Sequence, residues 1–189
     1  MLFVSERNGG MMILTKHEML GTDKSGVRMQ LIADASQTGG TATLQRVFLA
    51  SDEPGASPHV HAYSFEAFFL QSGSMFFLEG ECIKEVRAGD VVLVPPGVHH
   101  AFAAGPCGAE ANIVLTPGVE RFDYFRLLAE VMEGRRPVGQ LKEAGYIYDN
   151  VLVESATWEH FLLDHAITGE RTEQMLSLIH ISEPTRLLS

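Results

Sequence analysis

Short apolar runs, many of them alternating with polar residues, follow one another from Val27 to Thr116. Gly, Pro, Asp and Ser separate these runs at short intervals, for example in the Pro-Pro-Gly turn at 95–97. A period of two is typical of strands with one buried face, and short strands joined by frequent turns favour an antiparallel sandwich or barrel. The expected strands are 28–33, 41–50, 65–71, 74–79, 91–94, 98–103 and 109–115.

The pattern changes to helical spacing after residue 118. An apolar stripe then predicts an amphipathic helix that ends at Gly134, and a second helix is expected over 157–167. Each should pack its apolar face on the barrel or across a dimer interface. The stripe of the first helix consists of Phe122, Phe125, Leu128 and Met132.

These patterns divide the chain into an N-terminal extension (1–26), a barrel (27–118), a C-terminal helical region packing on the barrel (119–175) and a tail (176–189). The tail contains the stretch LSLIHISEPTR, which resembles a translated sequencing adapter. Such a segment is excluded from fold prediction. Met1, Met11 and Met12 are all candidates for the start of the natural chain.

Composition and charge narrow the class of protein. The 189 residues are 46% hydrophobic and 20% charged, which allows one sizeable core. A formal net charge of −10 argues against nucleic acid or an anionic membrane as a partner, because both attract clustered Lys and Arg. The sequence has no apolar run of the roughly 18 residues that a spanning helix needs, and its two cysteines, Cys82 and Cys107, fit reduced thiols. We expect a cytoplasmic protein.

The stretch PHVHAYSFE at 58–66 carries the first candidate chemistry. His59 and His61 are two apart, so on a strand both imidazoles project from the same face and can share one ion. Glu66 would face the other way unless a bend at 62–64 starts a new strand. A third imidazole comes from the pair at 99–100, and choosing His100 also turns Phe102 inward.

Three neutral imidazoles and one carboxylate suit a divalent transition ion, with Fe, Ni, Co, Mn, Cu and Zn all open. The alternative is a solvent-facing strand that happens to carry histidines. Glu66 lies among apolar residues, where an unpaired buried carboxylate is costly. A metal ion would remove that cost, as would pairing with Arg46 or exposure at a rim.

The spacing His59-x-His61-x4-Glu66-x6-Gly73, followed by Gly89-x5-Pro95-x-Gly97-x2-His100, resembles the two motifs of the cupin superfamily. The resemblance implies an all-β fold, the cupin double-stranded β-helix or jelly-roll barrel, here with additional C-terminal helices. It also implies a homodimer. Glu53 and Ala104 depart from the pattern, since a glycine and often an asparagine stand there in the family. The metal ligands that the resemblance implies are His59, His61, Glu66 and His100.

The turn and helix start at 116–122, TPGVERF, resemble more narrowly the bacterial single-cupin quercetin 2,3-dioxygenase-like proteins. This implies a metal-dependent dioxygenase that cleaves a flavonol or related enol-type aromatic substrate with dioxygen, and in which Glu66 is ligand and base. The alternatives are a non-catalytic metal-dependent small-molecule-binding cupin and a cupin isomerase.

An apolar pocket beside the ion would suit such a planar substrate. Strand alternation selects its wall, although the same side chains could simply fill a small barrel. The expected wall residues are Leu31, Phe48, Phe68, Phe76 and Phe102.

Overall fold

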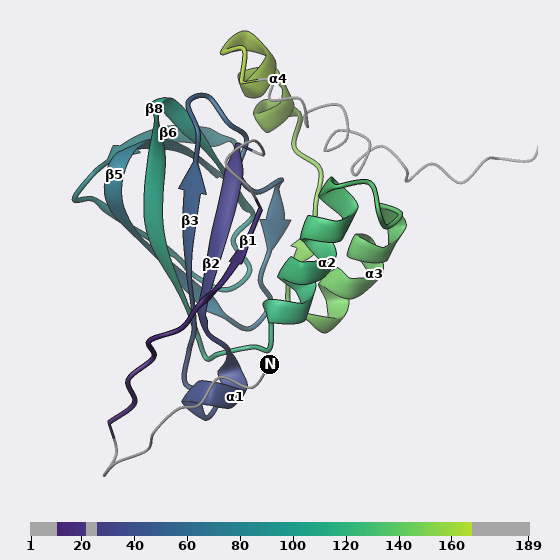
Figure 1. The fold of residues 1–189 in the computed structure, drawn as a ribbon. Helices are drawn as coiled ribbons and strands as arrows, with labels where there is room; N and C mark the ends of the chain where they lie inside the picture. The colour runs from purple at the N-terminus through teal and green to yellow at the C-terminus, as the bar shows by residue number, and fades with distance from the viewer. Residues whose placement is uncertain (1–10, 22–25, 168–189) are drawn as a thin grey trace, which may run out of the picture.

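Nine strands form a curved antiparallel sandwich flanked by helices in a computed structural model that describes residues 11–21 and 26–167 (Figure 1). The strands are β1 (Glu18–Leu20), β2 (Val27–Ala33), β3 (Thr43–Leu49), β4 (His59–Val60), β5 (Phe65–Glu79), β6 (Cys82–Arg87), β7 (Val91–Val94), β8 (His100–Thr116) and β9 (Val151–Leu152). The helices are α1 (Ala35–Thr38), α2 (Phe122–Met132), α3 (Gly139–Ile147) and α4 (Ala156–Asp164). The predicted all-β fold with C-terminal helices is confirmed.

Two long strands, β5 and β8, pair with each other along most of their length, from Phe65 opposite Thr116 to Glu79 opposite His100. The first part of β5 also pairs with β7, and its last part pairs with β6. Between these parts lies Gly73, whose φ of +72° and close approach to the carbonyl of Gly108 exclude a side chain. A shift in register at Gly73 therefore separates the part of β5 that pairs with β7 from the part that pairs with β6.

The sequence divided β5 and β8 into two strands each, because their glycines resemble breaks. In the structure the register shifts near Gly73, and pairing of β5 with β8 continues beyond the glycines of both strands. Strand β6 was not predicted, because the stretch CIKEVR has only weak apolar alternation and pairs on one side, with β5. Strands β4 and β9 have two residues each, too few to show a period.

Two of the C-terminal helices begin close to the predicted positions, and a third helix was not predicted. Helix α2 begins at Phe122 and ends shortly before Gly134, as predicted. Helix α4 begins after Ser155, whose side chain caps it, and ends earlier than predicted. Helix α3 was not predicted, because Gly139 and Gly145 lower its helix propensity. Its buried Leu141 and Ala144, which pack in one cluster with α2, provide the tertiary stabilisation.

Two helical clusters cover parts of the barrel (Figure 1). Leu31 of β2 is buried against the apolar side of α2 and α3. Trp158 and Leu162 of α4 pack on Leu78 and Ala101 at another part of the barrel. The C-terminal region therefore completes the core.

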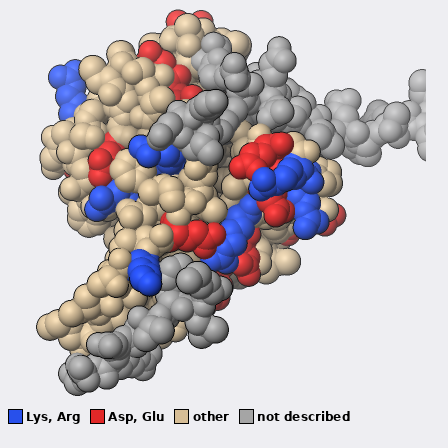
Figure 2. Space-filling model, viewed as in Figure 1, with Lys and Arg blue, Asp and Glu red and all other residues tan. Residues whose placement is uncertain are grey.

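Charged side chains of both signs lie next to each other over the helices (Figure 2). Arg126 of α2 bonds Glu18 of β1, and Arg136 bonds Glu130. None of the helices in the described part of the chain is long and apolar enough to cross a membrane. The tail predicted at 176–189 lies outside the described residues, as do residues 1–10.

Candidate metal centre

Three strands bring three histidines and a glutamate together inside the barrel. His59 of β4 lies opposite His100, the first residue of β8, and His61 follows directly after β4. Glu66 is the second residue of β5. All four side chains are buried, and one ligand atom from each lies within 4.8 Å of the others. The predicted cluster therefore assembles.

The bend predicted at 62–64 is present and is held by the C-terminal region. Strand β4 ends at Val60 and β5 begins at Phe65, so Glu66 lies on a new strand and faces the histidines. The carboxylate of Asp149 accepts hydrogen bonds from the backbone N–H groups of Ala62, Tyr63 and Ser64. His99 is exposed and His100 is buried, which confirms the prediction that His100 is the one that faces inward.

The hydrogen bonds of the imidazole rings select the tautomer that binds metals. Nδ1 of His59 lies 2.8 Å from the Ser57 carbonyl oxygen, and Nδ1 of His100 lies 3.0 Å from that of Val98. Nδ1 of His61 lies 2.5 Å from the carbonyl oxygen of Asp149. A carbonyl only accepts, so each Nδ1 carries the hydrogen and each neutral ring has its lone pair on Nε2. Three oriented lone pairs of this kind are typical of metal-binding histidines.

Glu66 supplies the fourth donor. Its Oε2 lies 2.9 Å from Nε2 of His100 and 3.2 Å from Nε2 of His61. Lone pairs on both sides repel one another, so this geometry requires a positive charge, carried by additional protons or by a metal ion. Burial by itself raises the pKa of Glu66, but the bonds and charges of His100 and His61 hold it well below its usual value.

The composition and burial of the cluster favour a metal ion as the source of the positive charge beside Glu66. Burial, together with the neighbouring imidazoles, holds the pKa of His59 well below its usual value, which disfavours a proton on that ring and leaves its Nε2 lone pair free for a metal ion. Exposure at a rim and pairing with Arg46, the two alternatives for Glu66, are both wrong. Glu66 is only 4% exposed, and Arg46 pairs instead with Glu110 at 3.3 Å. Three Nε2 atoms and a carboxylate fit a divalent transition ion.

A cavity of about 370 Å³ extends from the cluster towards α2. His59 and Glu66 form part of its wall, so the candidate metal centre faces the cavity directly. Apolar side chains from the barrel and from α2 make up most of the rest. These include Val27, Met29, Val47, Ile113, Phe125 and Leu128.

Of the five residues predicted to line a pocket, Phe102 lines this cavity and the other four lie elsewhere. Phe68 is buried in the barrel core against Phe77 and Phe102, and Leu31 is buried against α2 and α3. Phe76 packs on Phe161 of α4.

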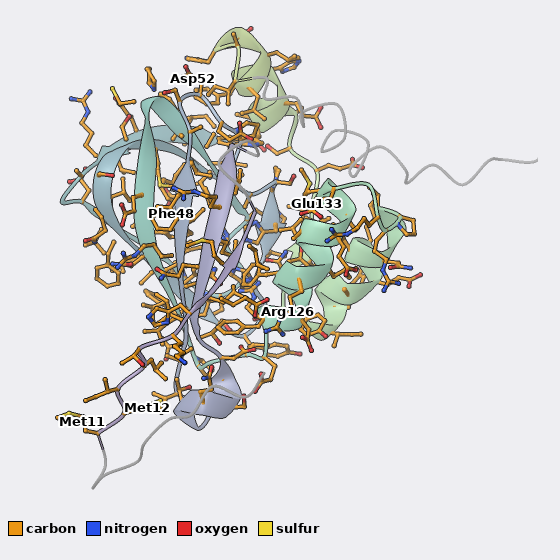
Figure 3. All side chains as sticks on the ribbon, viewed as in Figure 1. Met11, Met12, Phe48, Asp52, Arg126 and Glu133 are labelled. Atoms are coloured by element: carbon orange, nitrogen blue, oxygen red, sulfur yellow. The ribbon has the colours of Figure 1, made fainter. Side chains whose placement is uncertain are left out.

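Phe48 was predicted on the inner face, and this is wrong. Strand β3 buries Thr43, Gln45, Val47 and Leu49, so Phe48 points outward, with the Arg28 guanidinium over its ring (Figure 3). The wrong assignment arose because the inner face of β3 carries the polar Thr43 and Gln45, so the alternation of apolar residues indicated the opposite face.

The sequence did not identify the polar residues at the helical end of the cavity. Gln45 comes from β3, Arg121 and Tyr124 from the start of α2, and Asn150 from the segment before β9. Arg121 is only 1% exposed. Its NH2 group donates to Asn150 Oδ1 at 2.7 Å and to the carbonyl oxygen of Asp149 at 3.3 Å. These residues form no recognisable motif, because they are far apart in the sequence.

Residues 46–108, which contain all four cluster residues, match the family described as Cupin domain. No curated protein matches the chain.

Several solved structures resemble it. KdgF from Halomonas sp. is 15% identical over 53% of this chain and 88% of that chain, with a TM-score of 0.46. A variant of Streptomyces PAC13, solved with uridine, is 18% identical over 59% and 85%, with a TM-score of 0.48. A Thermotoga maritima protein described as a predicted oxalate decarboxylase is 20% identical over 56% and 98%, with a TM-score of 0.48.

The strand arrangement, the matching segment and the four converging side chains lead to one conclusion: the chain has the cupin β-sandwich fold, and the segment that matches the Cupin domain holds a buried cluster of three histidines and one glutamate suited to a metal ion.

Proposed function

We propose that the protein is a metal-dependent dioxygenase that cleaves a flavonol or a related enol-type aromatic substrate. One observation carries this proposal: the wall of a mostly apolar cavity contains His59 and Glu66, two members of the metal cluster. A cavity of about 370 Å³ is within the range that accepts small organic ligands. The three-histidine, one-glutamate donor set supports the metal part of the proposal.

A divalent transition ion held by His59, His61, Glu66 and His100 would supply a Lewis acid for an acidic substrate hydroxyl and redox chemistry with dioxygen. The enolate is oxidised, dioxygen is the oxidant, and both oxygen atoms enter the cleaved products.

The residues of the chain contribute positioning, proton transfer and exclusion of water. Glu66 faces the cavity, and an ionised carboxylate at this position can accept the hydroxyl proton. A carboxylate is a weak base, so the hydroxyl must be made acidic first. Phe102, Phe125 and Leu128 surround a bound substrate with apolar surface and limit the access of water.

Elemental analysis of the purified protein tests the metal part. The wild type should contain about one transition ion per chain, and His59→Ala, His61→Ala and His100→Ala should each lose most of it. His99→Ala is the matched control, because His99 adjoins His100 but is exposed. Full metal content in the three variants would overturn the site.

Oxygen consumption with a panel of flavonols and enolised diketones tests the reaction. Glu66→Gln should abolish turnover, and its metal content should stay measurable. Metal-loaded wild type that consumes no oxygen with any of these substrates would reject the dioxygenase. Binding without conversion would then indicate a non-catalytic small-molecule binder, and conversion without oxygen would indicate an isomerase.

The homodimer, the cytoplasmic location and the lack of nucleic-acid and membrane partners stay predictions. Sedimentation velocity tests the homodimer directly, since a monomer and a dimer of a 20.7 kDa chain separate clearly.

A further inference from the structure

Arg121 is a buried cation that the metal chemistry above does not use. Its side chain lines the cavity although only 1% of the residue is exposed to solvent. Buried arginines are normally paired with a carboxylate, because an isolated charge is costly to desolvate. Among the described residues, no carboxylate forms an ion pair with Arg121.

The acidic residues near Arg121 have other partners. The carboxylate of Asp34 accepts from the backbone N–H groups of Arg121 and Phe122 at the start of α2. The carboxylate of Asp149 accepts from the turn at 62–64. Glu66 belongs to the metal cluster. Burial lowers the pKa of Arg121 and these neighbouring charges oppose that shift, but none of them forms an ion pair with its guanidinium.

The hydrogen bonds of the guanidinium are also incomplete. The NH2 group bonds Asn150 and the carbonyl oxygen of Asp149, whereas Nε–H is buried without a partner in the described part of the chain. The buried Oε1 of Gln45, in the same cavity wall, likewise has no partner there. An unsatisfied buried donor or acceptor costs free energy, so one of each in the same cavity wall indicates a ligand with complementary polar atoms.

Arg121 is also close to the candidate metal centre. Its NH2 lies 3.4 Å from Nδ1 of His61, and both groups donate to the carbonyl of Asp149. A molecule in the cavity can therefore contact the cluster and approach the arginine at the same time.

We propose that Arg121 binds a carboxylate of the substrate, so that the preferred substrates are enol-type molecules with an apolar body and a carboxylate in addition to the enol oxygen. The Nε–H of Arg121 donates to this carboxylate, and Gln45 accepts from a hydroxyl or other donor of the same molecule. This inference rests on the proposed function for the enol part only; carboxylate binding by Arg121 needs neither metal nor turnover.

Calorimetric titration with cinnamate and with cinnamamide, its neutral counterpart of similar shape, tests the inference. A hydrogen bond to a charged group makes a difference of about 10- to 100-fold, so wild type should bind cinnamate tighter than cinnamamide by that factor. Arg121→Met should bind both probes with the affinity of cinnamamide. Arg136→Met is the control, because Arg136 is exposed and pairs with Glu130; it should keep the wild-type preference.

Two further arms keep the test decisive. Arg121→Lys retains the charge but lacks Nε–H, so the ratio of its cinnamate affinity to its cinnamamide affinity should be lower than that of wild type by about threefold or more. This variant replaces Arg121→Met in the test if Arg121→Met does not fold. Titrating wild type with and without metal distinguishes binding of the carboxylate by the metal ion from binding by Arg121. Absence of a cinnamate preference in wild type, or its persistence in the Arg121 variants, would overturn the proposal. So would a preference that exists only with metal, since it would belong to the ion. Missing metal or oxygen consumption would reject the proposed function alone.

Discussion

Asp149 holds His61 from two directions. Its carbonyl oxygen lies 2.5 Å from Nδ1 of His61, which keeps the hydrogen on Nδ1 and leaves Nε2 for a metal ion. Its carboxylate accepts from the backbone N–H groups of the turn at 62–64, at 2.6 to 3.2 Å. One residue of the C-terminal region therefore orients a candidate ligand and shapes the turn that brings Glu66 to the cluster.

Asp149→Ala should weaken both the fold and the metal site. Loss of the acceptor for three N–H groups should lower the free energy of unfolding by about 2 to 4 kcal/mol. Metal affinity, measured against a competing chelator, should fall about 10- to 100-fold. Asp149→Asn should be intermediate, because asparagine keeps one acceptor and tolerates the φ of +52°. Asp164→Ala on α4 is the control, and wild-type metal affinity in Asp149→Ala would show that the turn held by the Asp149 carboxylate does not matter for metal binding.

The metal-free protein should lose stability in acid. In the folded state the pKa of His59 lies well below its usual 6.5, and that of Glu66 lies well below its usual 4.5. The unfolded chain therefore binds protons at higher pH than the folded chain does. The stabilisation from His59 is present above about pH 6.5 and is lost as the pH falls below that value; that from Glu66 is lost below about pH 4.5.

Urea unfolding at a series of pH values measures this dependence. His59→Gln should flatten the change of unfolding free energy near pH 6, and the exposed His99→Gln should not. A wild-type unfolding free energy that stays constant between about pH 7 and 5 would contradict the lowered pKa of His59 as the cause of acid sensitivity.

Two glycines of α3 should respond in opposite directions to alanine. A Cβ at Gly145 would lie 2.5 Å from the carbonyl oxygen of Asn150, so Gly145→Ala should cost about 1 to 3 kcal/mol and displace Asn150 from Arg121. Gly139 has open space around its Cβ position, so Gly139→Ala should be neutral or stabilise by up to about 1 kcal/mol. Thermal unfolding of both variants checks the pair, and equal effects would show that the contact with Asn150 does not matter.

Filling the cavity from α2 should block ligands and spare the metal. Ala129 lines the cavity, so Ala129→Phe should weaken cinnamamide binding by about tenfold or more, with unchanged metal content. Ala88→Phe, at an exposed turn position between β6 and β7, is the control. Undiminished binding in Ala129→Phe would place the ligand somewhere else.

The candidate ligands could be predicted from the sequence because each lies in a short segment with its own turn signals. His59 and His61 are two apart, and the bend at 62–64 and the turn at 95–97 set the directions of Glu66 and His100. Alternation, in contrast, predicts which residues share a face but not which face is inside. On β3 the buried face carries Thr43 and Gln45, so Phe48 was assigned inward and lies outward (Figure 3). On β5 both Phe76 and Phe77 find apolar surroundings, because α4 covers the outer side.

The barrel, the main helices and the four residues of the cluster could all be predicted before the structure, since they depend on period, turn chemistry and spacing over a few residues. The choice of buried face and the surroundings of the cluster depend instead on contacts between distant parts of the chain. Asp149 contacts His61 across 88 positions of the chain, and Arg121 lies 60 positions from it. Such contacts depend on how the C-terminal helices fold back on the barrel, and no local pattern encodes that arrangement.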